Sequence, residues 1–414
     1  TQSGTTPSFT NTGTLSIGSG RLLTMTGGAL LTTSGSIFGN GISSGRLVVT
    51  NGTLAFSTAT LRAMMTLTNT AISGGAVTIG SGDTLNLSGG TLTAAVTNNG
   101  MLFAQDNATV AGSVTTNASS TIKVEGNAAF SSASLTFASG FTNNGAIILT
   151  AINAGYASLL TVTSGALVNA VGGSLISDPG PGGTRTLTAD LVNLGTFSPA
   201  ATIALNGTLD NQGTLTLPSN VSLTVTKPGA AHTNSGIINL TGGTVGTLTF
   251  PNTVTATTIT NTGTVSVNAG RTWLVGSGNT VINAATPTVG NIIGSGGTLN
   301  FSSATAFINN GIIAPGGVGT LGSLTYTGNF APGSGGTIHI DLGGTTSSLY
   351  DRLLINGTAA LGGTMNVQTV NGYTVGPGLN HDVITSTGMT TTMVLGTNPG
   401  CSGVISTTNY RLIC

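Results

Sequence analysis

The sequence carries very little charge. Charged residues make up 4% of its 414 residues, and nine acids balance nine bases, whereas roughly a quarter is usual in globular proteins. The charges are scattered singly, so there is no basic patch for a phosphate backbone and no polybasic run for anionic lipid. We therefore expect no nucleic acid among the partners of this protein.

Residues that favour helices are also scarce. The only lysines are Lys123 and Lys227, the only glutamate is Glu125, and aromatic residues make up 4% of the chain. Hydrophobic residues still reach 38%, and most of them are small or β-branched types that suit a pleated sheet. Because a disordered chain combines low hydrophobicity with high charge, this composition predicts a folded, nearly all-β protein.

The sequence lacks a long apolar run as well. No stretch approaches the roughly 20 apolar residues of a transmembrane helix, so we expect no direct membrane insertion of this segment. It begins at Thr1 without a basic and then apolar leader, which we interpret as a mature, processed form. We expect a secreted protein that is extracellular or attached to the cell surface.

Only two cysteines are present, Cys401 and Cys414. Their spacing fits no zinc motif, and no histidine lies close to them in the sequence. In an oxidising compartment they could close a small loop through an intrachain disulfide, which is the pairing we favour. Two free thiols and a link to another copy of the chain are the alternatives.

Glycine is abundant, with 66 copies, and it recurs within a motif. The motif is an apolar residue, Asn, a spacer, Gly and then an alternating strand. Asn and Gly tolerate positive φ, so we expect both at turns, and stacked Asn side chains could form an amide ladder. A shortened copy contains Asn51 and Gly52. The full copies place Asn and Gly at Asn11 and Gly13, Asn98 and Gly100, Asn143 and Gly145, Asn193 and Gly195, Asn211 and Gly213, Asn234 and Gly236, Asn261 and Gly263, and Asn309 and Gly311.

The spacing of these glycines indicates a solenoid. Gly195, Gly213, Gly236 and Gly263 follow one another at short, gradually lengthening intervals, and the longer intervals elsewhere are close to twice that period. Repeats of roughly 20–50 residues are typical of solenoids, propellers and arrays. A short period with strands that alternate apolar and polar residues favours a parallel β-helix. A propeller needs blades of roughly 40–45 residues with aromatic signatures, and a β-sandwich has no short fixed period.

Residues 311–367 go beyond a generic repeat. They contain, in order, the segments PGG, GTL, TGNF, GGTI, YDRLLING and LGGTMNV. This order resembles the C-terminal part of bacterial autotransporter passenger domains and related β-helical adhesins. The resemblance implies a right-handed β-helix exported to the cell surface, in which this segment, with Asp351 and Arg352, supports folding rather than catalysis. That family continues into a membrane domain, so we expect either its removal or another export route.

These observations together predict an all-β fold, a right-handed parallel β-helix (β-solenoid) forming a single elongated domain. We expect β-solenoid repeats over residues 1–305 and the autotransporter-passenger-like segment over residues 306–385. Residues 386–414 are then expected to form a C-terminal cap with the possible disulfide.

Catalysis has to be weighed, because some β-helix proteins are polysaccharide lyases or hydrolases. Such sites need clustered carboxylates, and only Asp178 with Asp190, and Asp341 with Asp351, lie within one coil of each other. We interpret these acids as solvated turn carboxylates.

The histidines give no clearer signal for catalysis. His232 lies beside a turn motif and His339 lies within a strand, while His381 and Asp382 are adjacent on a strand and should point to opposite faces. Tyrosines and the single tryptophan are dispersed along the sequence, so no platform for sugar stacking is evident. We therefore predict no catalytic residue, no metal ligand and no cofactor.

The resulting functional prediction is a non-enzymatic structural or adhesive protein of the bacterial cell surface. Its expected partners are a host or neighbouring cell surface, or other copies of itself. In the second case the coil near Thr1 would pair with the last coil of the next copy, a contact that does not close and yields filaments. The alternatives are a polysaccharide-active β-helix enzyme and a carbohydrate-binding surface protein.

Overall fold

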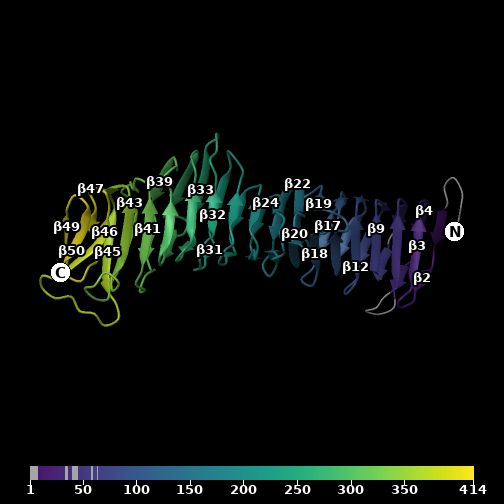
Figure 1. Ribbon diagram of the computed structural model, residues 1–414, viewed down its shortest axis with the longest axis horizontal. Helices are drawn as coiled ribbons and strands as arrows, with labels where there is room; N and C mark the ends of the chain where they lie inside the picture. The colour runs from purple at the N-terminus through teal and green to yellow at the C-terminus, as the bar shows by residue number, and fades with distance from the viewer. Residues whose placement is uncertain (1–7, 33–35, 40–44, 57–58, 63) are drawn as a thin grey trace. The chain divides into compact units, whose positions relative to one another are not determined.

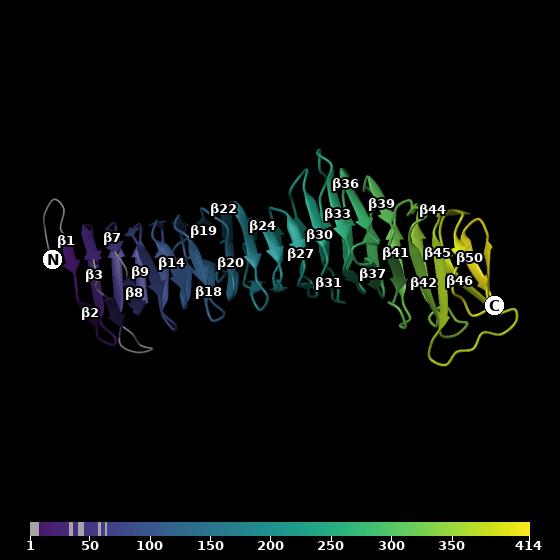
Figure 2. The ribbon, with the colours of Figure 1, turned by 180° about the vertical axis from the view of Figure 1, so that it is seen from behind.

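The computed structural model describes residues 8–32, 36–39, 45–56, 59–62 and 64–414. Within these residues every regular element is a β-strand, and nearly all strand pairs are parallel and in register. The chain forms two compact units, Thr1–Gly207 (unit 1) and Thr208–Cys414 (unit 2). Within each unit the strands follow one another as successive rungs in both ribbon views (Figures 1 and 2). The predicted parallel β-helix is thus confirmed.

Unit 1 repeats a coil of three short strands. Each strand pairs with its counterpart one coil later, so that Leu85 lies opposite Leu102. Along each strand, buried and partly exposed positions alternate, as expected when every second side chain points inward. Two successive coils consist of β10 (Ala71–Gly74), β11 (Ala76–Ile79) and β12 (Thr84–Ser88), then β13 (Gly90–Leu92), β14 (Ala95–Asn98) and β15 (Met101–Ala104).

The inward side chains of unit 1 form continuous apolar columns. One column has no exposed surface at any of its members, and each member stacks on its paired neighbour. Complete burial of such a side chain contributes about 1.5–3 kcal/mol, so every added coil stabilises those beside it. The members of this column are Leu85, Leu102, Ile122, Ile147 and Leu175.

Unit 2 has longer coils and a more aromatic interior. Trp273 pairs with Leu248 of the preceding coil, and Ile355 pairs with Tyr326 of the coil before its own. Two successive coils consist of β32 (Thr247–Phe250), β33 (Thr257–Asn261) and β34 (Thr264–Val267), then β35 (Thr272–Val275), β36 (Asn279–Asn283) and β37 (Asn291–Gly294).

Aromatic residues that are dispersed in the sequence gather inside unit 2. The rings of Trp273 and Phe301 lie 5.1 Å apart, and those of Tyr326 and Phe330 lie 4.9 Å apart, both in edge-on arrangements. Phe301 also contacts Tyr326 at 5.7 Å. Because all four are at most 3% exposed, this cluster fills the core and offers no surface for sugar stacking.

The parallel arrangement ends near the C-terminus. The strand β46 (Asn380–Thr385) pairs in parallel with β43 (Arg352–Asn356) on one edge and antiparallel with β50 (Asn409–Ile413) on the other. In turn, β49 (Ser402–Ile405) pairs antiparallel with β50. The boundaries proposed at residues 305/306 and 385/386 stay predictions.

Candidate functional site

Four motif asparagines of unit 2, together with Asn283, form a buried amide ladder. Each Nδ2 donates a hydrogen bond to the Oδ1 of the asparagine one coil later, over 2.7–2.8 Å. A second N–H is taken up by backbone, as when Asn283 donates to the Ile312 carbonyl at 3.1 Å. The primary amide suits this position because it is both donor and acceptor. The ladder runs through Asn211 in β27 (Leu209–Asn211), Asn234 in β30 (Ala231–Asn234), Asn261, Asn283 and Asn309 in β39 (Ala306–Asn309).

Unit 1 contains a shorter ladder of the same kind. Asn143 donates to Asn169 at 2.9 Å, and Asn169 donates to Asn193 at 2.8 Å. Asn169 and, in unit 2, Asn283 lie outside the motif, because neither is followed by Gly at the second position. These two residues occupy the coils that two of the doubled glycine intervals, those ending at Gly195 and Gly311, indicate.

A threonine interrupts the ladder towards the start of unit 1. Thr116 takes the asparagine position opposite Asn98. Its hydroxyl donates to the Thr142 carbonyl at 2.9 Å and accepts from the Asn144 N–H at 2.8 Å. Asn98 still makes the backbone contact of the ladder asparagines and donates to the Thr121 carbonyl at 2.9 Å. A hydroxyl holds the local turn, but it cannot continue the chain of amides.

The motif glycines are needed for close packing, and the expectation of positive φ at the full motif copies is wrong. Neither their asparagines nor their glycines have positive φ, although Asn51 of the shortened copy does, at 52°. A Cβ at Gly145 would overlap the Ser120 carbonyl oxygen, and a Cβ at Gly263 would overlap that of Gly236. Gly13 meets nothing within 4 Å. Carbonyl oxygens of the preceding coil equally crowd Gly100, Gly195, Gly236 and Gly311.

Two acids expected to be solvated are completely buried. Asp341, in β42 (Thr337–Leu342), and Asp351 both have no exposed surface. The Asp351 carboxylate accepts the N–H of Gly322 at 2.8 Å and that of Asp341 at 3.0 Å. Asp341 accepts the N–H of Gly319 at 2.6 Å and contacts His339 Nε2 at 3.0 Å. The carboxylates therefore fasten the loop before β41 (Ser323–Thr327) to the next coil.

Burial affects the two acids differently. Burial raises the pKa of Asp351 to about 8, helped by the nearby charge of Asp341 and opposed by its two backbone donors. Burial also acts to raise the pKa of Asp341, but hydrogen bonds from His339, Gln368 and Gly319 outweigh it and leave this pKa below its usual value. The structural role that the resemblance implies for Asp351 stays a prediction.

Asp178 and Asp190, the other two acids within one coil of each other, are half-buried in unit 1. The buried Arg185 donates a hydrogen bond to the backbone carbonyl of Asp178 at 3.1 Å. A second buried arginine, Arg271, joins coil corners in unit 2, with donation to the Val221 and Val245 carbonyls at 2.7 and 2.8 Å. Burial lowers the pKa of both arginines. No pattern in the sequence points to either contact.

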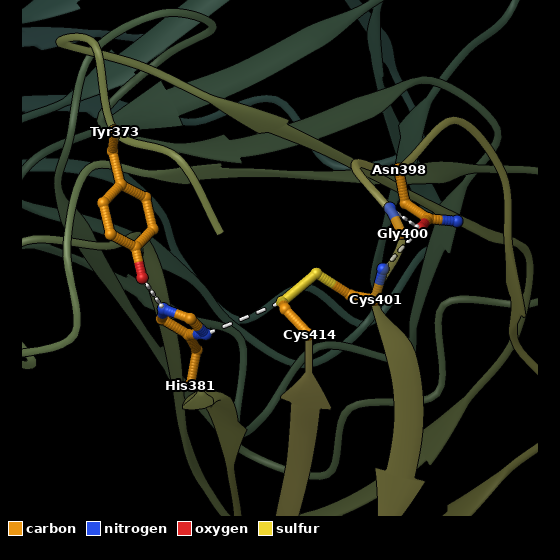
Figure 3. The surroundings of a disulfide bond; sticks show 6 residues. All are labelled: Tyr373, His381, Asn398, Gly400, Cys401 and Cys414. Atoms are coloured by element: carbon orange, nitrogen blue, oxygen red, sulfur yellow. Dashed lines mark hydrogen bonds between the residues drawn. A yellow bond between two sulfur atoms is a disulfide. The ribbon is translucent and has the colours of Figure 1, made fainter. Parts of the chain in front are cut away.

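The remaining polar cluster lies at the C-terminal end (Figure 3). Cys401 and Cys414 form an intrachain disulfide. The buried His381 lies beside it, with Nδ1 3.9 Å from Cys414 Sγ and Nε2 3.3 Å from the Tyr373 hydroxyl. Burial lowers the pKa of His381, opposed by a hydrogen bond to the Gly344 backbone, and this shift favours the neutral ring.

The other histidines and Asp382 also have protein partners. Asp382 points away from His381, as expected for adjacent strand residues, and binds Arg411 through two contacts of 2.7 and 3.0 Å. His232 is buried, and its Nδ1 accepts the N–H of Leu209 at 3.1 Å.

The stacked parallel strands and the asparagine ladder place the chain among the parallel β-helix proteins. No protein-family model matches the chain, and no curated protein matches it either. Among the described residues there is no helix with the length and apolar character needed to cross a membrane. Across residues 8–32, 36–39, 45–56, 59–62 and 64–414, no group of three or more potential metal ligands gathers.

Proposed function

We propose that this chain is a secreted structural or adhesive β-solenoid of the bacterial cell surface, similar in type to autotransporter passengers. The exterior of the coils carries the proposal. In unit 1 one outward row consists of five threonines on successive coils, each paired in register with the next. The row runs through Thr91, Thr109, Thr136, Thr161 and Thr188.

Such a surface suits contacts with a partner that do not depend on long-range electrostatic attraction. The row lies on strands whose inward neighbours are buried, for example Leu135 and Phe137 on either side of Thr136. β-Branched side chains have few rotamers, so the hydroxyls and methyl groups form a regular, stiff array. With 4% charged residues in the whole chain, contacts through this array depend on hydrogen bonds and close fit.

Bead adhesion tests this proposal. Beads coated with the protein should be retained on cell layers or on polymer surfaces, and retention should change little between low and high salt, because screening acts on charges. A matched pair of variants, Thr136→Lys in the row and Thr121→Lys on another strand face beside Lys123, separates the row from the rest. Loss of retention only in Thr136→Lys supports the proposal. Equal retention of both variants, or release by salt, contradicts it.

The alternative of a polysaccharide-active enzyme is tested on the same protein. Release of reducing ends from acidic or neutral glycans, with or without Ca²⁺, would support that alternative. Loss of that release in Asp351→Asn, with folding retained, would assign it to the buried acids.

Self-association is the second part of the proposal. Head-to-tail stacking requires an edge strand that presents an alternating buried face to the incoming coil. In the sheet that contains β46 and β50, the outermost strand at the C-terminal end is β49, and all four of its residues are exposed. Pairing with β49 would thus bury little, and self-association at this end needs a different edge.

A further inference from the structure

The C-terminal hairpin, defined here as residues 401–414, closes the end of unit 2. It contains β49 and β50, joined by a short turn, and β50 lies antiparallel on β46. All five described residue pairs along β46 and β50 are antiparallel, from Asn380 opposite Ile413 to Thr385 opposite Asn409. The hairpin therefore occupies the strand edge at which the parallel stack would otherwise continue.

The hairpin covers apolar surface only through β50. Tyr410 and Leu412, on alternate positions of β50, are 4% and 0% exposed, and they lie opposite Ile384 and His381. Without β50 the edge of β46 would present these buried residues together with unpaired N–H and C=O groups. Exposed edges of this kind pair with other chains.

The hairpin is fastened by few contacts outside its strand pairing. Asp382 binds Arg411, and His381 Nδ1 lies 3.9 Å from Cys414 Sγ. Three backbone hydrogen bonds join the ends of the hairpin to the segments beside β46: Cys414 N–H to the Leu379 carbonyl at 3.0 Å, Gly378 N–H to the Cys414 carbonyl at 2.8 Å, and Ser386 N–H to the Thr408 carbonyl at 2.8 Å. The disulfide joins the start of β49 to the end of β50, so while it is closed the two strands of the hairpin stay cross-linked.

The connection before the hairpin, residues 396–400, is irregular. It contains Asn398, whose Oδ1 accepts the N–H groups of Gly400 and Cys401 (Figure 3). The first contact lies within the connection and the second joins it to the first residue of the hairpin, and neither reaches β46. The connection itself is held by Thr397, whose N–H donates to Asn366 Oδ1 at 3.1 Å and whose carbonyl accepts the Val367 N–H at 2.7 Å.

We propose that the edge of β46 is a self-association surface for a second copy of this chain, covered by the chain's own hairpin while Cys401 and Cys414 are bonded. A dithiol uncovers this surface by reducing the disulfide. The S–S bond takes up two electrons and two protons to give two S–H groups, and the dithiol becomes a cyclic disulfide. The released β50 of one copy then pairs with β46 of another.

The occupant is β50 of the second copy because its fit to β46 already exists within one chain. Asp382 meets Arg411, Ile384 meets Tyr410 and His381 meets Leu412 in the closed form, and the same pairs re-form between copies. Exchange in both directions gives a closed pair of chains, as in domain swapping. This inference does not depend on where the protein resides or on what surface it binds.

Light scattering after size-exclusion chromatography tests the surface. The oxidised protein should elute as a monomer, and the protein treated with dithiothreitol should shift to a dimer whose fraction rises with concentration. The Cys401→Ser/Cys414→Ser double variant should do the same without reductant. A monomer at all concentrations, with circular dichroism unchanged and free thiols titrated as open, overturns the inference.

A mixing experiment identifies the strands. Two copies in the Cys401→Ser/Cys414→Ser background each carry one new cysteine, Thr385→Cys in β46 or Asn409→Cys in β50, which are paired positions. Oxidation of the mixture should give a cross-linked dimer. The control mixture replaces Thr385→Cys with Thr298→Cys, on the exterior of β38 (Gly297–Asn300), and should stay uncross-linked. Equal cross-linking in both mixtures would contradict exchange at β46, whereas bead adhesion tests the proposed function separately.

Discussion

The asparagine ladder and the C-terminal hairpin stabilise their surroundings in different ways. The ladder repeats one contact, an amide donating to the next amide, in coil after coil. The hairpin is built once, from an antiparallel pair, a disulfide and one half-buried ion pair. Damage to a repeated contact affects both neighbouring coils, whereas damage to the hairpin stays at the end of the stack. The predictions below test this difference.

The largest effect is expected in the middle of the ladder. Asn234→Ala removes the acceptor of Asn211 and the donor to Asn261, so two buried amides lose a partner. Each unsatisfied group costs about 1–3 kcal/mol, so the free energy of unfolding should fall by about 3 kcal/mol in urea titrations. Asn98→Ala, beside the interruption at Thr116, should cost less, and an equal loss in the two variants would argue against a cooperative ladder.

Removing the disulfide should lower the free energy of unfolding by a similar amount, but the structural effect should stay local. For a loop of about 15 residues a disulfide contributes about 3 kcal/mol, and the Cys401→Ser/Cys414→Ser variant loses that constraint. Hydrogen exchange should speed up at β50 and at the β46 edge while the ladder amides keep their protection. Faster exchange throughout unit 2 would show that the hairpin supports the whole unit.

A methyl group added at a motif glycine should lower the free energy of unfolding by a smaller amount. Gly263→Ala places a Cβ against the Gly236 carbonyl oxygen, and such overpacking costs about 1–3 kcal/mol. Gly13→Ala is the matched control, because nothing lies within 4 Å of its Cβ position. If urea unfolding reports the same loss for both, the crowding explanation of the motif glycines is wrong.

The last effect concerns pH. Burial raises the pKa of Asp351 to about 8, above the value of about 4 in the unfolded chain. The folded form therefore holds a proton that the unfolded form has lost, so stability should fall as pH rises from about 4 to 8. Asp351→Asn should flatten the profile, and an unchanged profile in this variant would contradict the assignment to Asp351.

Much of the fold could be predicted from local sequence. Alternation within strands and the period of the Asn and Gly motif are sufficient to predict coils, because each coil repeats the same local geometry. The ladder follows from the motif as well. Asn169 and Asn283 lie outside the motif because their turns are wider, although the doubled intervals indicate their coils.

The site features depend on contacts between distant residues, and the sequence does not reveal these. Asp351 meets Gly322 from the previous coil, Arg271 reaches the Val221 carbonyl two coils earlier, and the core rings come from separate strands. The prediction of positive φ at the motif glycines is wrong for the same reason. Their crowding comes from carbonyl groups of the preceding coil, which local backbone preferences do not include.

The most direct test of the account is whether neighbouring coils stack in the stated register. Thr109 and Thr136 are paired across adjacent coils, and Ala138 lies two positions out of register. Cysteines at 109 and 136 should form a disulfide rapidly and nearly completely on mild oxidation, while cysteines at 109 and 138 should not. Equal bonding in the two double variants, or none in the paired one, would contradict the stacked solenoid.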